Sequence, residues 1–257
     1  MLAYDQVGDN DRLLASLLTN LGALHQLTRN FGLAATYLEQ RGHVGFVSAG
    51  DEAMHALELS RALYYSGEHG RSADESARAV SLAQADPGVK HLLAAFAGKA
   101  GFYHMVAERY EAALGYYGQQ LASRGGAAGD QGLRARLNSG YCQFRLGQGE
   151  AARATFEALV ESVGATPGVR KAAMAGSLDS LQPARVAVLA RGFLAQVTDD
   201  TEQVEKLRGE RMTLMETWLK DPALFSSNEI SVLGFLARDC NGVAKSQLER
   251  GARGAAI

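Results

Sequence analysis

The sequence predicts an all-α chain made of consecutive antiparallel helical hairpins. Apolar residues recur at helical spacing along nearly the whole chain, and no window alternates between apolar and polar residues over the length of a strand. Polar residues stand at the start of many of these periodic segments, and glycine or proline interrupts them at intervals. Consecutive helices joined by short turns lie antiparallel, so the pattern predicts hairpins throughout.

Three apolar stripes identify helices within the first two thirds of the chain. Residues three or four positions apart share one face of a helix, and such a stripe is typical of a helix that packs one side against its neighbours. The stripes are Leu13, Leu14, Leu17, Leu18, Leu21 and Leu24; Ala73, Ala77 and Val80; and Phe156, Leu159, Val160 and Val163.

The helix boundaries follow from local chemistry. Polar caps predict helix starts at Asp51, Asp130 and Thr201. Glycine and proline predict helix ends at Asp86-Pro87-Gly88, Arg124-Gly125-Gly126, Thr166-Pro167-Gly168 and Asp221-Pro222. Further breaks near Gly32, at 67–70, near Ala107 and at 147–149 divide the intervening segments into two helices each.

A repeat emerges when the hairpins are aligned. Small residues recur with a period of 39 or 40 residues, by subtraction of their positions, at Ala34, Ala73, Ala113 and Ala152. A second packing residue stands four positions later, at Leu38, Ala77, Tyr117 and Phe156. Twelve positions before each alanine stand Gly22, Arg61, Gly101 and Gly140. Small side chains let two helices approach to about 8–10 Å, so these positions are expected where the hairpin helices cross.

These residues resemble the tetratricopeptide repeat (TPR) family. Leu21-Gly22 followed by Ala34 and Leu38 is similar to its two helices, and residues 109–117 are similar to its second helix. Leu146-Gly147 is similar to its inter-helix turn. The second unit departs most, and its register is open to a shift of one residue. The resemblance covers residues 11–163, with a period longer than the family's usual ~34 residues, as in TPR-like arrays of large bacterial regulators.

The resemblance implies a right-handed superhelical stack of hairpins, a TPR-like α-solenoid, whose first helices line a concave groove. It also implies a peptide-binding site in that groove. In such a site, asparagine amides pair with a peptide backbone, and arginines hold a carboxylate from two sides. The candidate groove residues are Asn20, Gln26, Lys99, Phe102, Arg134, Asn138, Tyr141 and Arg145.

The expected domain organisation has three parts. Residues 1–166 form about four TPR-like hairpins, residues 167–250 form further hairpins that continue or cap the array, and residues 251–257 form a disordered tail. The formal net charge is −2, which argues against a dedicated nucleic-acid or membrane-surface protein. Two cysteines, Cys142 and Cys240, are too few for a disulfide framework, and each is expected to be a small buried side chain. We expect a cytoplasmic protein without a membrane span.

The predicted function is non-catalytic recognition of a protein or peptide partner, by a scaffold or sensor. The sequence contains no metal-ligand spacing, phosphate loop or nucleophile motif, so no cofactor, metal or catalytic residue is expected. Three alternatives stay open, one of them an enzyme with a deep pocket that holds converging titratable groups. The chain could be the sensor part of a bacterial transcription regulator, since residues 225–237 resemble the opening helix of LuxR-type DNA-binding domains. It could also be a structural protein that self-assembles into a homo-oligomer, in which an uncapped end buries apolar surface against a copy of itself. Trp218 is expected to be a core or hairpin-interface anchor, with an exposed interface anchor as the alternative.

Overall fold

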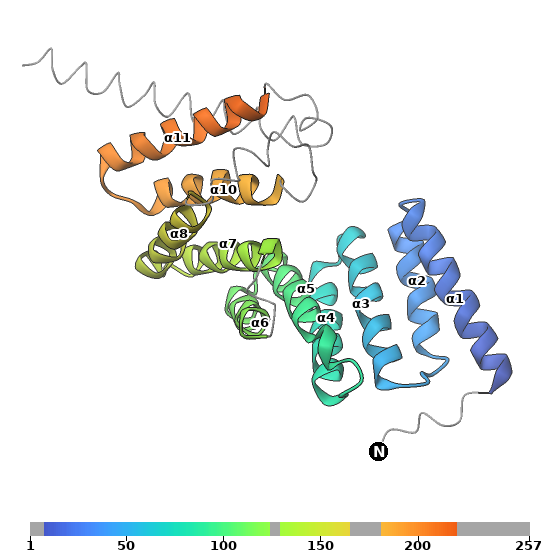
Figure 1. Ribbon diagram of the computed structural model, residues 1–257. Helices are drawn as coiled ribbons and strands as arrows, with labels where there is room; N and C mark the ends of the chain where they lie inside the picture. The colour runs from blue at the N-terminus through green and yellow to red at the C-terminus, as the bar shows by residue number, and fades with distance from the viewer. Residues whose placement is uncertain (1–7, 124–128, 165–180, 220–257) are drawn as a thin grey trace, which may run out of the picture. The chain divides into compact units, whose positions relative to one another are not determined.

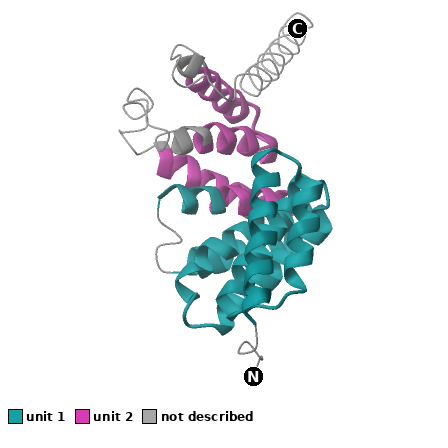
Figure 2. Ribbon diagram, turned by 90° about the vertical axis from the view of Figure 1, so that its right-hand side faces the viewer, with its two compact units in different colours: residues 1–135 teal, residues 136–257 magenta. Residues whose placement is uncertain are grey.

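The computed structural model describes residues 8–123, 129–164 and 181–219. Within these ranges the chain forms α-helices, one short 3-10 helix and no strand (Figure 1), which confirms the all-α prediction for this part of the chain. The chain divides into two compact units, residues 1–135 and 136–257 (Figure 2). None of the helices in the described ranges has the length and apolar character needed to cross a membrane.

The helices follow one another with short connections. Unit 1 contains α1 (Asp9–Leu27), α2 (Phe31–Gly42), α3 (Ala49–Tyr65), α4 (His69–Ala85), the 3-10 helix η1 (Lys90–Leu92), α5 (Leu93–Val106) and α6 (Tyr110–Ala122). Helix α7 (Gly129–Arg145) contains the unit boundary, and unit 2 continues with α8 (Gly149–Gly164), α10 (Leu181–Val197) and α11 (Thr201–Leu219). The predicted helix starts near Asp130 and Thr201 are confirmed, but the cap of α11 is Asp200, whose Oδ1 accepts a 2.9 Å hydrogen bond from the Glu202 amide. Helix α3 begins earlier than predicted because Ser48 caps it, accepting a 3.0 Å hydrogen bond from the Asp51 amide.

The same three-residue turn closes the first four hairpins. Its middle residue has a positive φ in every case: 60° at Arg29, 91° at Gly67, 60° at Glu108 and 75° at Gly147. The next residue donates its amide to a carbonyl in the last turn of the preceding helix, over 2.8 Å from Asn30 to His25, 2.8 Å from Glu68 to Leu63, 2.9 Å from Arg109 to His104 and 2.9 Å from Gln148 to Gln143. This bond ends the first helix and reverses the chain direction. The breaks expected within the segments are therefore confirmed.

The predicted helix crossings are confirmed in three hairpins. Ala34, Ala113 and Ala152 have no exposed surface. A Cβ atom built on the paired glycine would lie 2.9 Å from Leu38 at Gly22, 2.7 Å from Tyr117 at Gly101 and 2.6 Å from Phe156 at Gly140. These distances are too short for a side chain, so only glycine admits the bulky residue of the second helix.

The second hairpin uses the same crossing with serines, one residue away from the predicted register. Counted from the turn, Ser60 occupies the place of the glycines, and Ser72 and Ser76 occupy the places of the alanine and the bulky residue. All three serines are completely buried, and the Ser72 hydroxyl donates a 2.7 Å hydrogen bond to the Ser60 carbonyl. The prediction of Arg61 at this crossing is therefore wrong by one residue, because Arg61 is exposed.

Neighbouring hairpins of unit 1 pack through the sides of their helices. Leu59 and Leu63 of α3 pack against α2, and Phe96 of α5 packs against α4. Alanine predominates on the other side of these contacts, at Ala34, Ala35, Ala79 and Ala83. Small side chains on one helix facing large ones on the next let the helices approach closely.

The leucine stripe of α1 is the main departure from the expected packing. The buried side of α1 consists of Ala15, Leu18, Gly22 and Gln26. Most of the predicted stripe is exposed instead, by 71% at Leu13, 45% at Leu14, 55% at Leu17 and 53% at Leu24. Helical spacing identifies a face, and it does not say whether a neighbour covers that face.

A buried arginine orders the connection between α2 and α3. The Arg41 guanidinium donates to the Gly45 carbonyl over 2.5 Å and to the Asp51 carboxylate over 2.8 Å. The guanidinium also lies 4.6 Å from the centroid of the Phe46 ring. The centroid of the His55 ring lies 5.1 Å from that of Phe46. Burial, with the nearby positive charges of Arg41 and Arg78, lowers the pKa of His55 to about 4.

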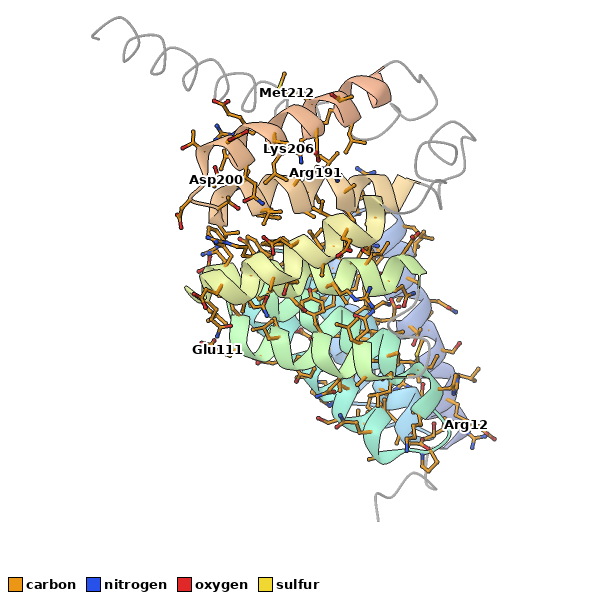
Figure 3. The ribbon with its side chains drawn as sticks, turned by 60° about the vertical axis from the view of Figure 1, so that its left-hand side comes forward. Arg12, Glu111, Arg191, Asp200, Lys206 and Met212 are labelled. Carbon is orange, nitrogen blue, oxygen red and sulfur yellow. The ribbon has the colours of Figure 1, made fainter. Side chains whose placement is uncertain are left out.

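The hairpin of α10 and α11 differs from the first four. Gly192 has the same distance from the turn as the glycines above, but it faces Arg211, whose Nη1 would lie 2.5 Å from a Cβ at this position. Arg191 of α10 and Glu210 of α11 form an ion pair over 2.9 Å, and Arg191 lies between the two helices (Figure 3). The sequence motif ends before this hairpin, as expected, and long polar side chains take the place of its bulky residue.

Several expectations concern residues outside the described ranges. They are the helix ends at 124–126, 166–168 and 221–222, the LuxR-like segment at 225–237, Cys240, the tail at 251–257 and the side chain of Trp218. The expected boundary between residues 166 and 167 also lies there.

The turn geometry makes a stability prediction. A positive φ is sterically unfavourable for a residue with a Cβ atom and not for glycine. Arg29→Gly should therefore raise the free energy of unfolding, measured in urea titrations, by about 0.5–1 kcal/mol. The matched change Gly67→Ala should lower it by a similar amount. A loss of stability in Arg29→Gly would contradict this assignment.

The helix crossing makes a second prediction. Ala113→Leu should lower the free energy of unfolding by roughly 1–3 kcal/mol, because the added atoms have no space between α5 and α6. Ala112→Leu, at the exposed neighbouring position, should change it by less than about 0.5 kcal/mol. Equal effects of the two substitutions would show that the crossing lies elsewhere.

The buried His55 predicts a pH dependence. Its pKa is about 4 in the fold, against about 6.5 in the unfolded chain, so the unfolded state takes up the proton first as the pH falls. The free energy of unfolding should fall by about 2 kcal/mol between pH 7 and pH 5 on this account and level off below pH 4. His55→Leu should remove this part of the pH dependence, as measured by urea unfolding across the range. An unchanged pH profile in that variant would contradict the prediction.

Candidate functional site

The first helix of each of the first four hairpins displays one stripe of unburied side chains. Counted back from the last helical residue, positions 0, 4, 7 and 11 share one side of a helix because this spacing follows its turns. No residue at these positions is buried in α1, α3, α5 or α7. We call these residues the first-helix stripe: Ser16, Asn20, Ala23 and Leu27; Met54, Glu58, Arg61 and Tyr65; Ala95, Lys99, Phe102 and Val106; Arg134, Asn138, Tyr141 and Arg145.

All but one of the predicted groove residues belong to this stripe. Those on it are Asn20, Lys99, Phe102, Arg134, Asn138, Tyr141 and Arg145. Gln26 is buried, and its Oε1 accepts a 2.7 Å hydrogen bond from the Arg61 Nε. Its position suits it to hold Arg61 rather than to contact a ligand directly.

Arg61 is a charged stripe residue that the sequence analysis assigned to the helix crossing instead. The one-residue shift of the second hairpin moves it out of the helix crossing and onto the stripe. Besides its bond to Gln26, it forms a 3.0 Å ion pair with Glu58 one turn earlier. Two partners on two helices fix the direction of its guanidinium. Its place on the stripe could have been found by counting residues back from Gly67, the left-handed residue of the turn.

Aromatic side chains lie on and beside the stripe in unit 1. Phe31 stacks on Tyr65 with ring centroids 4.6 Å apart, and Tyr64 lies 4.9 Å from Tyr65 and 5.3 Å from Phe102. Each contact of this kind contributes about 0.5–1.5 kcal/mol. The rings belong to three successive hairpins, so they join the hairpins at one side. Tyr65 remains 56% exposed and offers an apolar surface.

Tyr103 anchors this aromatic cluster from below. It is buried, and its ring centroid lies 5.4 Å from that of Tyr64 and 5.5 Å from that of Phe102. Burial raises the pKa of its phenol to about 12, so it remains neutral. The buried ring of Tyr103 thus supports the exposed rings of this cluster.

In α7 the stripe is held by neighbours within unit 2. The Arg145 Nη1 donates a 2.7 Å hydrogen bond to the Tyr141 hydroxyl. The Tyr141 ring lies 5.4 Å from that of Phe193 in α10, which stacks on Phe156 in α8. Cys142 is buried as expected, and burial raises the pKa of its thiol to about 12, which makes it unreactive.

The stripe is basic and partly aromatic. It carries four cations, Arg61, Lys99, Arg134 and Arg145, and one anion, Glu58, which is paired with Arg61. Exposed amides and rings stand between these charges. Such a surface can donate hydrogen bonds to carboxylates and main-chain carbonyls and can cover apolar side chains. In the described ranges no group of three histidine, cysteine, aspartate or glutamate side chains is placed to hold a metal ion.

The comparisons with known proteins do not assign the chain to a family. No protein-family model matches the chain, and no curated protein sequence matches it. Among solved structures, it is similar to the Rap conjugation gene regulator of the plasmid pLS20 in complex with the Phr* peptide. The identity is 15% and the TM-score 0.43, over 96% of this chain and 79% of that chain. Similarity at this level assigns neither a family nor a function.

Proposed function

We propose that this chain is a non-catalytic recognition protein in which the first-helix stripe residues of unit 1 and those of unit 2 each bind a peptide segment of a protein partner. One observation carries the proposal. Four successive first helices leave equivalent positions unburied, while the position five residues before each helix end is buried in all four. The fold therefore uses one side of each first helix for packing and leaves the other for display.

The polar members of the stripe suit a peptide main chain and an acidic group. The amides of Asn20 and Asn138 can each donate to a carbonyl and accept from an amide at the same time. Lys99 and Arg134 are exposed cations that can pair with a carboxylate of the ligand. The preferred ligand is therefore a peptide with acidic residues.

The aromatic members supply an apolar contact. Tyr65 and Phe102 lie against Tyr64, and these rings are fixed in place by their neighbours. Rigid rings lose little freedom when a ligand covers them, so most of the burial energy contributes to affinity. We expect an aliphatic or aromatic residue near the acidic residues of the ligand.

Binding rather than catalysis is proposed because the polar groups of the stripe are spread along four helices. A general acid, a base and a nucleophile must converge on one reacting atom to act together. The regulatory role expected from the sequence fits the same surface, since a sensor also needs a preformed site for its ligand.

A displayed library of random short peptides tests this function. We expect selection on the wild-type chain to enrich peptides that combine acidic and apolar residues. The variant Asn138→Ala with Arg145→Ala should bind the enriched peptides about tenfold more weakly, a difference of about 1.4 kcal/mol. Fluorescence anisotropy with a labelled peptide measures the affinity, and far-ultraviolet circular dichroism should show unchanged helix content.

The matched control removes an amide and a cation away from the stripe. Gln40→Ala with Lys206→Ala changes two exposed residues, on α2 and α11, and it should leave the affinity unchanged. Failure to enrich any peptide, or equal binding by the stripe variant and the wild type, would rule out this site.

A further inference from the structure

The exposed leucine face of α1 corresponds to a face that is covered elsewhere in unit 1. Counted back from the turn, Leu17, Leu21 and Leu24 occupy the same positions as three residues of α3 and three of α5. Those six residues are all buried, with exposed fractions between 0% and 8%: His55, Leu59, Ala62, Phe96, Ala100 and Tyr103. In α3 and α5 this face packs against the second helix of the preceding hairpin. The face of α1 is thus built to receive a helix.

The exposed apolar surface extends beyond these three leucines. Helix α1 lies at one edge of unit 1, next to α2 (Figure 1). Leu13 is 71% exposed at its beginning and Leu27 is 83% exposed at its end. On α2, Leu33 is 52% exposed one turn before Tyr37, whose ring stacks on that of His25 in α1. Contiguous apolar surface of this extent is typical of an interaction site.

We propose that this leucine face, formed by Leu13, Leu14, Leu17, Leu21 and Leu24, binds the same face of a second copy of the chain. The two α1 helices lie antiparallel about a two-fold axis near the middle of the helix. Leu13 of one copy then lies beside Leu24 of the other, with Leu17 and Leu21 at the centre. A two-fold axis needs one self-complementary surface and gives a closed dimer.

The charges of α1 favour this antiparallel arrangement. Asp9 and Asp11 stand at the start of α1 beside Arg12, which lies 4.0 Å from the Asp9 carboxylate, so this end keeps an excess of one negative charge. His25 stands in the last turn of α1, and Arg29 stands in the turn that follows. The leucine face between these ends carries no charge. Antiparallel packing brings the acidic end of one copy to the basic end of the other, whereas parallel packing would place like charges together. The two helix dipoles are also opposed in the antiparallel pair.

Sedimentation equilibrium over a concentration range tests the dimer. We expect the wild-type chain to approach twice its monomer mass as the concentration rises. Leu17→Glu with Leu24→Glu should lower the association constant at least a hundredfold, and helix content should be unchanged because both side chains are exposed. The matched control Ala112→Glu with Ala151→Glu, at exposed positions of α6 and α8, should dimerise like the wild type.

Charge reversal tests the orientation at low ionic strength. Asp9→Lys with Asp11→Lys should weaken association severalfold, and addition of Arg29→Glu to this variant should restore part of it. A monomer at every concentration would overturn the proposal, and so would a dimer that the leucine variant leaves intact. Charge reversal without any effect would overturn the antiparallel arrangement. The peptide site is tested separately, since neither set of variants contains the side chains changed in the binding experiment.

Discussion

The close contact between a small residue in one helix and a bulky residue in the next determines the geometry of the first hairpins. Where glycine faces Leu38, Tyr117 or Phe156, the second helix packs directly on the first helix backbone. In the second hairpin, small serine side chains occupy this contact, and their hydroxyl groups donate hydrogen bonds to nearby carbonyls. This contact fixes the rotation of each helix about its axis. It therefore also determines which side chains pack against neighbouring hairpins and which stay exposed to ligands.

Much of this arrangement could be predicted from local sequence. The crossings at Gly22, Gly101 and Gly140 could be predicted because the bulky residue of the second helix leaves no space for a Cβ atom there, so glycine recurs in the sequence. The second crossing was predicted one residue away from its true position. Ala73 stands next to Ser72 and happens to fit the 39- or 40-residue period, since alanine is common in this chain. Counting from the left-handed turn residue would have corrected it, since the turn has the same length in all four hairpins.

The surface of the molecule was harder to predict than its packing. The leucines of α1 have the periodicity of a core helix, and only the absence of a covering helix among the described residues makes them exposed. Likewise Gln26 has the composition of a ligand-binding residue, but its side chain is occupied by Arg61 from the next hairpin. Both outcomes depend on residues that are distant in sequence, and periodicity within one helix does not report them.

The adjacent positions of Ser60 and Arg61 have an evolutionary consequence. One step along a helix rotates a side chain by roughly 100°, which here separates a fully buried hydroxyl from an exposed guanidinium. Insertion or deletion of a single codon within a first helix would therefore exchange interior and exterior residues over all of that helix beyond the lesion. Proteins built from such hairpins are expected to diversify by substitution along the displayed side of the first helices and to accept length changes only in the loops between hairpins.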